Sequence, residues 1–160
     1  MKDTIKNTIL LFSLIVSVST ATAQLKIGAN LPDLQLKNNK ETTISLTSMK
    51  GKTVLIDFWA SWCAPCRLAN KKLVPFYNSH KSENFEIVGI SLDTDATKWR
   101  NAIQKDKLGY EQLIDAKGFD AASVVLFGVE ELPNSYLFDA SGKLVAINPT
   151  EEEIIAQIKK

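Results

Sequence analysis

The sequence predicts an α/β fold in which helices flank a mixed central sheet, and three observations support this. Residues 53–60 and 85–92 are nearly continuous apolar runs, as expected of strands covered on both faces. A helical stretch, residues 64–79, joins them and is long enough for a right-handed βαβ crossover. The 160 residues contain no internal repeat or low-complexity tract, so one domain is expected after the N-terminal segment.

The first 23 residues have the pattern of a secretory signal peptide. Two lysines precede the apolar run of residues 9–18, and residues 21–23, Ala-Thr-Ala, match a small-x-small cleavage site. A run of about ten residues is shorter than the roughly 20 that a membrane-spanning helix needs. We therefore expect cleavage after Ala23 and export to the periplasm as a domain of residues 24–160, with an uncleaved membrane anchor as the alternative.

The remaining elements in the first two thirds of the mature chain follow from local patterns. Residues 34–36 and 43–46 alternate around a polar segment and predict a β-hairpin before the main core. Pro75 lies within the first predicted helix, where it cannot donate a backbone hydrogen bond, so a kink or break is expected there. Three further elements are predicted: a helix over residues 95–105, a strand over 111–114 and a short helix over 121–127.

The C-terminal region predicts a second hairpin and a final helix. Residues 134–138 and 143–147 flank the turn-forming sequence Asp-Ala-Ser-Gly, which indicates an antiparallel pair. Thr150 and Glu153 have the spacing of a capping box, which marks the start of a helix that ends at Lys159.

Composition and charge exclude several classes of function. Nineteen Lys and Arg residues face eighteen Asp and Glu residues, and removing the first 23 residues leaves seventeen of each sign. The mature chain therefore has no basic excess with which to bind nucleic acid or an anionic membrane. Two cysteines and one histidine are too few for a four-ligand Cys/His zinc site.

The residues expected to carry chemistry are Cys63 and Cys66, at the junction of strand 53–60 and helix 64–79. Cys63 falls at the helix start, where free backbone N–H groups and the helix dipole lower a thiol pKa. Pro65 fits the first turn, where its missing N–H loses no partner. Cys66 lies about one turn further on, more covered and close enough to attack a mixed disulfide. We predict that Cys63 is the nucleophile and Cys66 the resolving thiol.

A Cys-x-x-Cys pair can also serve other functions. The pair is also half of a zinc site, but the chain has no second pair and His80 is its only imidazole. A copper chaperone that binds Cu(I) through both thiolates is the alternative from another class, although no histidine or methionine is well placed near the pair. A peroxidase would need its reactive cysteine in a different setting. We expect redox chemistry and no metal.

The segment 57–66, Asp-Phe-Trp-Ala-Ser-Trp-Cys-Ala-Pro-Cys, resembles the active-site motif of the thioredoxin superfamily. More narrowly, it is similar to exported thiol-disulfide oxidoreductases of the TlpA/ResA type. Matches in the same order occur at residues 27–33, at Gly51-Lys52 and across residues 132–143. The resemblance implies a thioredoxin-like fold with an extra N-terminal β-hairpin and a βα insertion that holds helix 95–105.

The resemblance also implies an activity and partners. It implies a reductant of disulfides in protein substrates, recharged by a membrane thiol-electron donor, with no bound cofactor. We expect a monomer. An oxidase or isomerase differs from a reductase only in redox poise, which residue patterns do not fix, so the direction of transfer stays open.

Further site residues come from the resemblance. The proline that matches Pro133 is cis in the family and packs beside the cysteine pair, whereas the bare sequence favours an ordinary trans turn proline. The backbone of the preceding residue, Leu132, is implied to pair with an extended substrate segment. The substrate-binding surface is completed by Trp62, Ala64 and Pro65.

Asp57 is an acid inside an apolar strand, where burial is expected to raise its pKa. It is either a strand-edge carboxylate that reaches solvent or, as in thioredoxin, a buried base that takes a proton from Cys66, directly or through water. ResA-type proteins often have Asn at this position and Glu three residues after the second cysteine, where this chain has Ala69. We hypothesise that Asp57 supplies the proton handling that Ala69 cannot.

Overall fold

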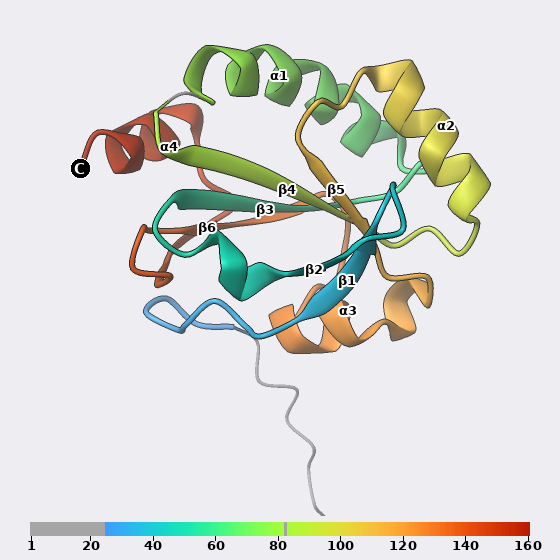
Figure 1. Ribbon diagram of the computed structural model, residues 1–160, viewed down its shortest axis with the longest axis horizontal. Coiled ribbons are helices and arrows are strands. Elements are labelled where there is room, and N and C mark those ends of the chain that lie inside the picture. Colours follow the sequence, from blue (N-terminus) through green and yellow to red (C-terminus); the bar gives the residue numbers. More distant parts are fainter. Residues whose placement is uncertain (1–24, 82) are drawn as a thin grey trace, which may run out of the picture.

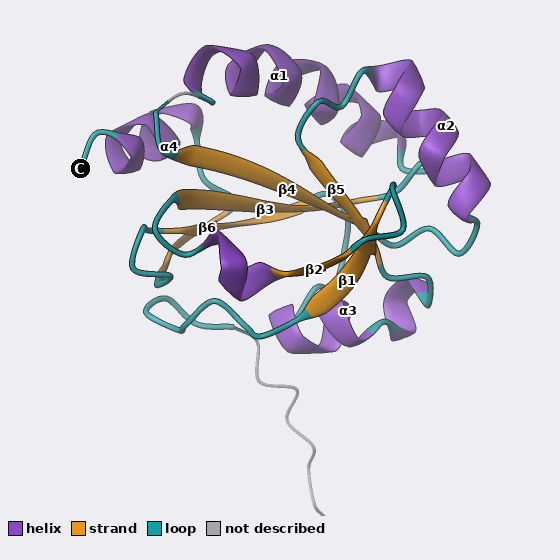
Figure 2. Ribbon diagram, viewed as in Figure 1, coloured by secondary structure: helices purple, strands orange, loops and turns teal. Residues whose placement is uncertain are grey.

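The computed structural model describes residues 25–81 and 83–160, which form one sheet with helices on both faces (Figure 1). The predicted signal peptide, residues 1–23, lies outside the described residues. Helices α1, α2 and α4 lie over one face of the sheet, and α3 lies under the other (Figures 1 and 2). The helices are α1 (Ala64–His80), α2 (Ala96–Asp106), α3 (Ala122–Phe127) and α4 (Glu151–Ile158).

The sheet is mixed and has seven strands. They are β1 (Gln35–Asn38), β2 (Thr43–Ser45), β3 (Thr53–Trp59), β4 (Phe85–Ser91), β5 (Glu111–Ile114), β6 (Asn134–Phe138) and β7 (Leu144–Ile147). Their order is β2-β1-β5-β4-β3-β6-β7. Strands β3, β4 and β5 are parallel, whereas β1 and β6 run antiparallel to their neighbours. The predicted α/β fold, with its N-terminal hairpin and βα insertion, is confirmed.

Strand β3 is the structural centre because it pairs with β4 on one side and β6 on the other, and all its residues are buried. Its side chains alternate between the two faces. Ile56 and Phe58 belong to the core that includes α3, whereas Leu55 and Trp59 belong to the core that includes α1, α2 and α4. Asp57 alternates with Ile56 and Phe58, and its carboxylate therefore lies on the α1 side of the sheet.

Capping side chains fix where the helices begin. Asp95 accepts hydrogen bonds from the first turn of α2, and the predicted capping box of Thr150 and Glu153 is complete at α4. Helix α1 begins directly after Cys63. Of the kink or break expected at Pro75, the break does not occur: α1 continues to His80, and Phe76 beyond the proline is buried in the core.

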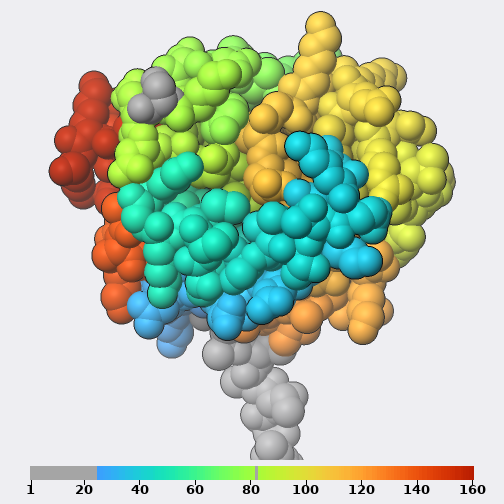
Figure 3. Space-filling view, in the orientation of Figure 1, coloured from blue at the N-terminus to red at the C-terminus, as the bar shows by residue number. Residues whose placement is uncertain are grey.

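The N-terminal hairpin extends the sheet beyond β5, the strand that follows α2. In the space-filling view, the segment containing β1 and β2, coloured blue to teal, covers the centre of the visible face (Figure 3). Strand β1 pairs with β5, and Glu41 in the hairpin turn forms an ion pair with Arg100 of α2. The hairpin therefore ties the inserted helix to the rest of the sheet.

Candidate active site

Cys63 and Cys66 form a disulfide, with their Cα atoms 5.3 Å apart. The sequence places Cys63 at the N-cap of α1, where its Sγ accepts a hydrogen bond from the Cys66 N–H at 3.2 Å. Cys63 is 5% exposed and Cys66 is 1% exposed. Cys63 is thus slightly more exposed than Cys66, and an N–H donor is already directed at its sulfur.

The loop before Cys63 is held by a buried carboxylate that the sequence analysis missed. Asp93 accepts hydrogen bonds from the Ser61 N–H at 2.8 Å and from the Ser61 hydroxyl at 2.6 Å. The Ser91 hydroxyl donates to the same carboxylate at 2.7 Å. Asp93 follows β4 and Ser61 follows β3, and these strands are parallel neighbours whose carboxyl ends lie at the same edge of the sheet. The sequence positions of the two residues, each just after a predicted buried strand, could therefore have indicated this contact. The network fixes the approach to the cysteine pair.

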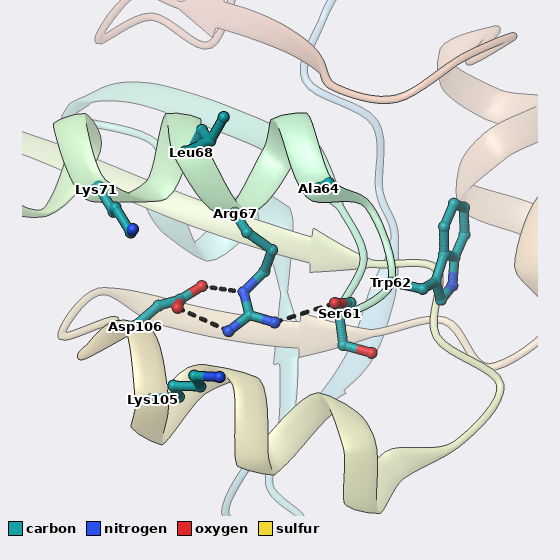
Figure 4. A pocket seen from close by; sticks show the side chains of 8 residues that line it. All are labelled: Ser61, Trp62, Ala64, Arg67, Leu68, Lys71, Lys105 and Asp106. Carbon is teal, nitrogen blue, oxygen red and sulfur yellow. Dashed lines mark hydrogen bonds and ion pairs between the residues drawn. The ribbon is translucent and has the colours of Figure 1, made fainter.

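A second fixed contact joins α1 to α2 beside the disulfide. Arg67 makes a two-pronged ion pair with Asp106, with Nη2 donating to Oδ1 at 2.7 Å, and its Nη1 donates to the Ser61 carbonyl at 3.1 Å (Figure 4). Burial works to raise the pKa of Asp106, but hydrogen bonding and charge from Arg67 outweigh it and lower that pKa. The hydrogen bond from Arg67 to Asp106 raises the Arg67 pKa in turn.

Asp57 lies in the central strand, not at an edge, and is 6% exposed. Burial raises the pKa of Asp57 from 3.8 to about 7. Its carboxyl group lines a cavity of about 220 Å³ between α1, β6 and the start of α4, together with Ala69, Lys72 and Pro133. The structure thus brings the buried acid, the position where ResA-type relatives often carry Glu and the proline of the site around one cavity.

Buried polar groups also lie beneath α1. The Tyr110 hydroxyl donates to Asn70 Oδ1 at 3.3 Å, and Trp59 Nε1 donates to Gln112 Oε1 at 3.0 Å. Burial, followed by the charge of Asp57, raises the Tyr110 pKa. Asn70 comes four residues after Cys66 in the sequence, and its position on the buried side of α1 was not predicted.

The predicted substrate-binding residues surround the disulfide on two sides. The Leu132–Pro133 peptide bond is cis, and Leu132 packs against the core cluster that contains both cysteines. Trp62 is 59% exposed and lies against Phe119, with ring centroids 6.5 Å apart. Ala64 and Pro65 are exposed in the first turn of α1.

Two kinds of feature are absent from the described part of the chain. Residues 25–81 and 83–160 contain no group of three or more His, Cys, Asp or Glu side chains placed to hold a metal ion. No helix within these same ranges has the length and apolar character needed to cross a membrane.

Comparison with known proteins gives a consistent result. Residues 27–147 match the AhpC/TSA family. The thiol-disulfide oxidoreductase ResA of Bacillus thuringiensis subsp. konkukian is 27% identical over 152 residues, which cover 93% of this chain and 86% of that protein.

Two solved structures are also similar. The thiol-disulfide oxidoreductase of Bacteroides fragilis NCTC 9343 has a TM-score of 0.75 and 31% identity, covering 82% of this chain and 98% of that one. The thioredoxin domain of a thiol-disulfide oxidoreductase of Bacteroides vulgatus has a TM-score of 0.76 and 29% identity, covering 85% of this chain and 97% of that one.

Proposed function

Since the chain belongs to the AhpC/TSA family and is a thioredoxin-like thiol-disulfide oxidoreductase similar to ResA, we propose that it is an exported reductant of disulfides in proteins. The observation that carries the proposal is the disulfide at the start of α1, in which Cys63 is the more exposed residue and its Sγ already accepts a backbone hydrogen bond. The same N–H group would stabilise the Cys63 thiolate in the reduced protein.

The reaction has two exchange steps. The Cys63 thiolate attacks one sulfur of the substrate disulfide, that S–S bond breaks, and the other substrate sulfur leaves as a thiolate. The Cys66 thiol then loses its proton and attacks Cys63 Sγ, which forms the Cys63–Cys66 disulfide and releases the second substrate thiolate. Two electrons pass from the cysteine pair to the substrate, and the two released thiolates take up protons.

Asp57 is the base that we assign to the second step. A carboxylate can accept the Cys66 proton only when it is ionised, and its pKa of about 7 leaves it able to take and return a proton near neutral pH. The cavity that Asp57 lines has space for a water molecule beside the carboxylate, one turn along α1 from Cys66.

Binding of the substrate chain is assigned to the two sides of the disulfide. The backbone of Leu132, before the cis proline Pro133, would pair with an extended substrate segment. Trp62, Ala64 and Pro65 would contact the residues on the other side. The exposed indole of Trp62 supports this assignment, because a large exposed aromatic side chain beside a reactive group is typical of an interface anchor.

Export and recharging complete the proposal. The leader-like pattern of residues 1–23 supports export to the periplasm, with the mature domain starting after Ala23 and acting as a monomer. A reductant in an oxidising compartment must be reduced again after each turnover, and we assign this to a membrane thiol-electron donor. N-terminal sequencing of the protein recovered from a periplasmic extract tests the cleavage site.

The reduction potential of the Cys63–Cys66 pair tests the direction of transfer. The protein is equilibrated with dithiothreitol or glutathione buffers, and the oxidised fraction is read after the thiols are trapped by alkylation. A potential of about −230 mV or lower supports a reductant, whereas about −120 mV would make the protein an oxidant. If no disulfide forms between the two cysteines, the redox proposal is wrong and copper binding becomes the function to test.

A further inference from the structure

A groove between α1 and α2 begins beside Cys63. A cavity of about 490 Å³ has walls from both helices and from the Ser61–Trp62 loop (Figure 4). A second hollow of about 330 Å³ shares Trp62, Arg67 and Lys105 with the first and extends along α2 to Lys98. Because they share these residues the two hollows adjoin, and together we call them the α1–α2 groove, bounded by Trp62, Arg67, Lys71, Lys98, Lys105 and Asp106.

The groove carries an excess of positive charge. Arg67 is paired with Asp106, the only acid in the walls of the groove. The three lysines, Lys71, Lys98 and Lys105, are exposed, and none has a carboxylate within 4.0 Å among the residues that the structure describes. Three cations without an ion-pair partner thus surround one groove, although residues 24–160 as a whole have seventeen cationic and seventeen acidic side chains.

The Arg67–Asp106 pair makes the groove a fixed surface. Figure 4 shows the Arg67 side chain crossing from α1 to Asp106 of α2, with Lys71 on the α1 side and Lys105 on the α2 side of the pair. The charge of Lys71 helps to lower the Asp106 pKa, so Asp106 stays ionised and the bridge is kept near neutral pH. A ligand would therefore meet three exposed lysines around a floor that Arg67 and Asp106 bridge.

Two exposed apolar side chains also line the groove. Leu68 of α1 is 62% exposed and Trp62 is 59% exposed. Trp62 and Ala64 line the cavity and stand on either side of Cys63 in the sequence. A polypeptide whose sulfur reaches Cys63 can therefore lay its neighbouring residues in the groove.

We propose that the α1–α2 groove binds a segment rich in Asp and Glu that lies next to the reducible disulfide of the substrate protein. This deepens the proposed function, on which it rests, by naming the chemical class of the substrate. Carboxylates on the substrate neutralise the three lysines, while an apolar residue beside them packs on Trp62 and Leu68. Attraction of this kind acts chiefly on the rate of association, so it selects which disulfides Cys63 attacks first.

The test uses three peptides that differ only in charge. Each carries one cysteine, activated as a mixed disulfide with an aromatic thiol, and three adjacent residues that are all Glu, all Gln or all Lys. The Cys63 thiolate of the reduced protein attacks the peptide sulfur, the S–S bond breaks, and the coloured aromatic thiolate leaves. Its release gives the second-order rate of attack, which does not require the protein to be a reductant in the cell.

Two triple variants locate the effect. The groove variant carries Lys71→Gln, Lys98→Gln and Lys105→Gln. The control variant removes the same charge through Lys50→Gln, Lys143→Gln and Lys160→Gln, at exposed lysines near the end of the sheet where β3 begins, away from Cys63.

At low ionic strength, we expect the Glu peptide to react about tenfold faster than the Gln peptide, and the Lys peptide to react more slowly than either. The groove variant should lose most of this ratio and the control variant should keep it. High salt should reduce the ratio in the unmodified protein.

Equal rates for the Glu and Gln peptides, or a ratio that survives in the groove variant, would overturn the proposal. So would a dimer that the groove variant dissociates, because the groove would then bind a second copy of this chain. An oxidising potential of the cysteine pair would overturn the proposed reductant but would leave the peptide ratio unchanged, so the two failures are distinguishable.

Discussion

Asp57 on β3 and Ala69 on α1 line the same cavity, although they belong to different elements. ResA-type proteins often have Glu at the position of Ala69 and Asn at that of Asp57. The shared cavity therefore gives a structural basis for the hypothesis that Asp57 supplies the proton handling that Ala69 cannot. A carboxylate at either position would face one shared space next to the turn of α1 that carries Cys66.

The proton-transfer role of Asp57 predicts a change in pH dependence. Asp57 accepts a proton only when ionised, so the rate of the second exchange step should rise with pH through about 7 in the unmodified protein. Asp57→Asn should slow this step by about 100-fold at pH 7 and remove that rise. Rapid mixing with an aromatic disulfide measures the step, because resolution by Cys66 releases the second aromatic thiolate.

A double variant provides the matched control. Ala69→Glu in the Asp57→Asn background returns a carboxylate to the same cavity and should recover part of the lost rate. If Asp57→Asn leaves the pH profile unchanged, Asp57 is not the base.

The burial of Asp57 also predicts an effect on stability. The folded protein keeps a proton on Asp57 up to pH about 7, whereas the unfolded chain releases it near 3.8. Stability is therefore lost as pH rises through this window, and the loss is complete above about pH 7. Asp57→Asn removes the penalty, which is at most about 4 kcal/mol.

Urea unfolding of the oxidised protein measures this difference. The gain in unfolding free energy from Asp57→Asn should be large at pH 8 and much smaller at pH 4. A gain of the same size at both pH values would show that ionisation of Asp57 is not its source.

The hydrogen bonds of Asp93 predict that a conservative substitution of this residue loosens the loop before Cys63. Asp93→Asn replaces one acceptor oxygen with a donor that faces Ser61 or Ser91, and should destabilise the protein by about 1–3 kcal/mol. The loosened loop should also speed alkylation of Cys63 in the reduced protein. Asp95→Asn is the control, because Asn caps a helix as well as Asp and the change should cost little.

Close packing at Gly89 predicts sensitivity to a single methyl group. A Cβ on Gly89 would lie 2.4 Å from Gln112 Oε1, the atom that accepts the Trp59 hydrogen bond. Gly89→Ala should displace this side chain and cost about 1–3 kcal/mol by urea unfolding. Gly109→Ala, where a Cβ meets nothing within 4 Å, should leave stability nearly unchanged. Equal losses of stability in the two variants would show that contact with Gln112 is not the cause.

The fold could be predicted from sequence because its signals are local. The apolar run of β3, the turn before β7 and the capping box at Thr150 each act within a few residues, and the structure has the elements they predict. The cysteine pair was found in the same way, from its position between a buried strand and a helix.

The contacts that hold the site in place were not predicted, because they join distant parts of the chain. Ser61 and Asp93 are 32 residues apart, and Arg67 and Asp106 are 39 residues apart. No local pattern distinguishes these acids from solvated surface carboxylates. Only the alignment of neighbouring parallel strands, and the packing of α2 beside α1, brings the partners together.

The N-terminal hairpin offers a practical attachment point. Strands β1, β5 and β4 stand between β2 and the strand that leads to Cys63. A fluorophore attached to the exposed side chain of Lys40 in the hairpin turn would therefore sit several strands from the reacting sulfurs and leave the Glu41–Arg100 ion pair in place. Such a labelled protein could report on substrate capture while the exchange chemistry proceeds as in the parent molecule.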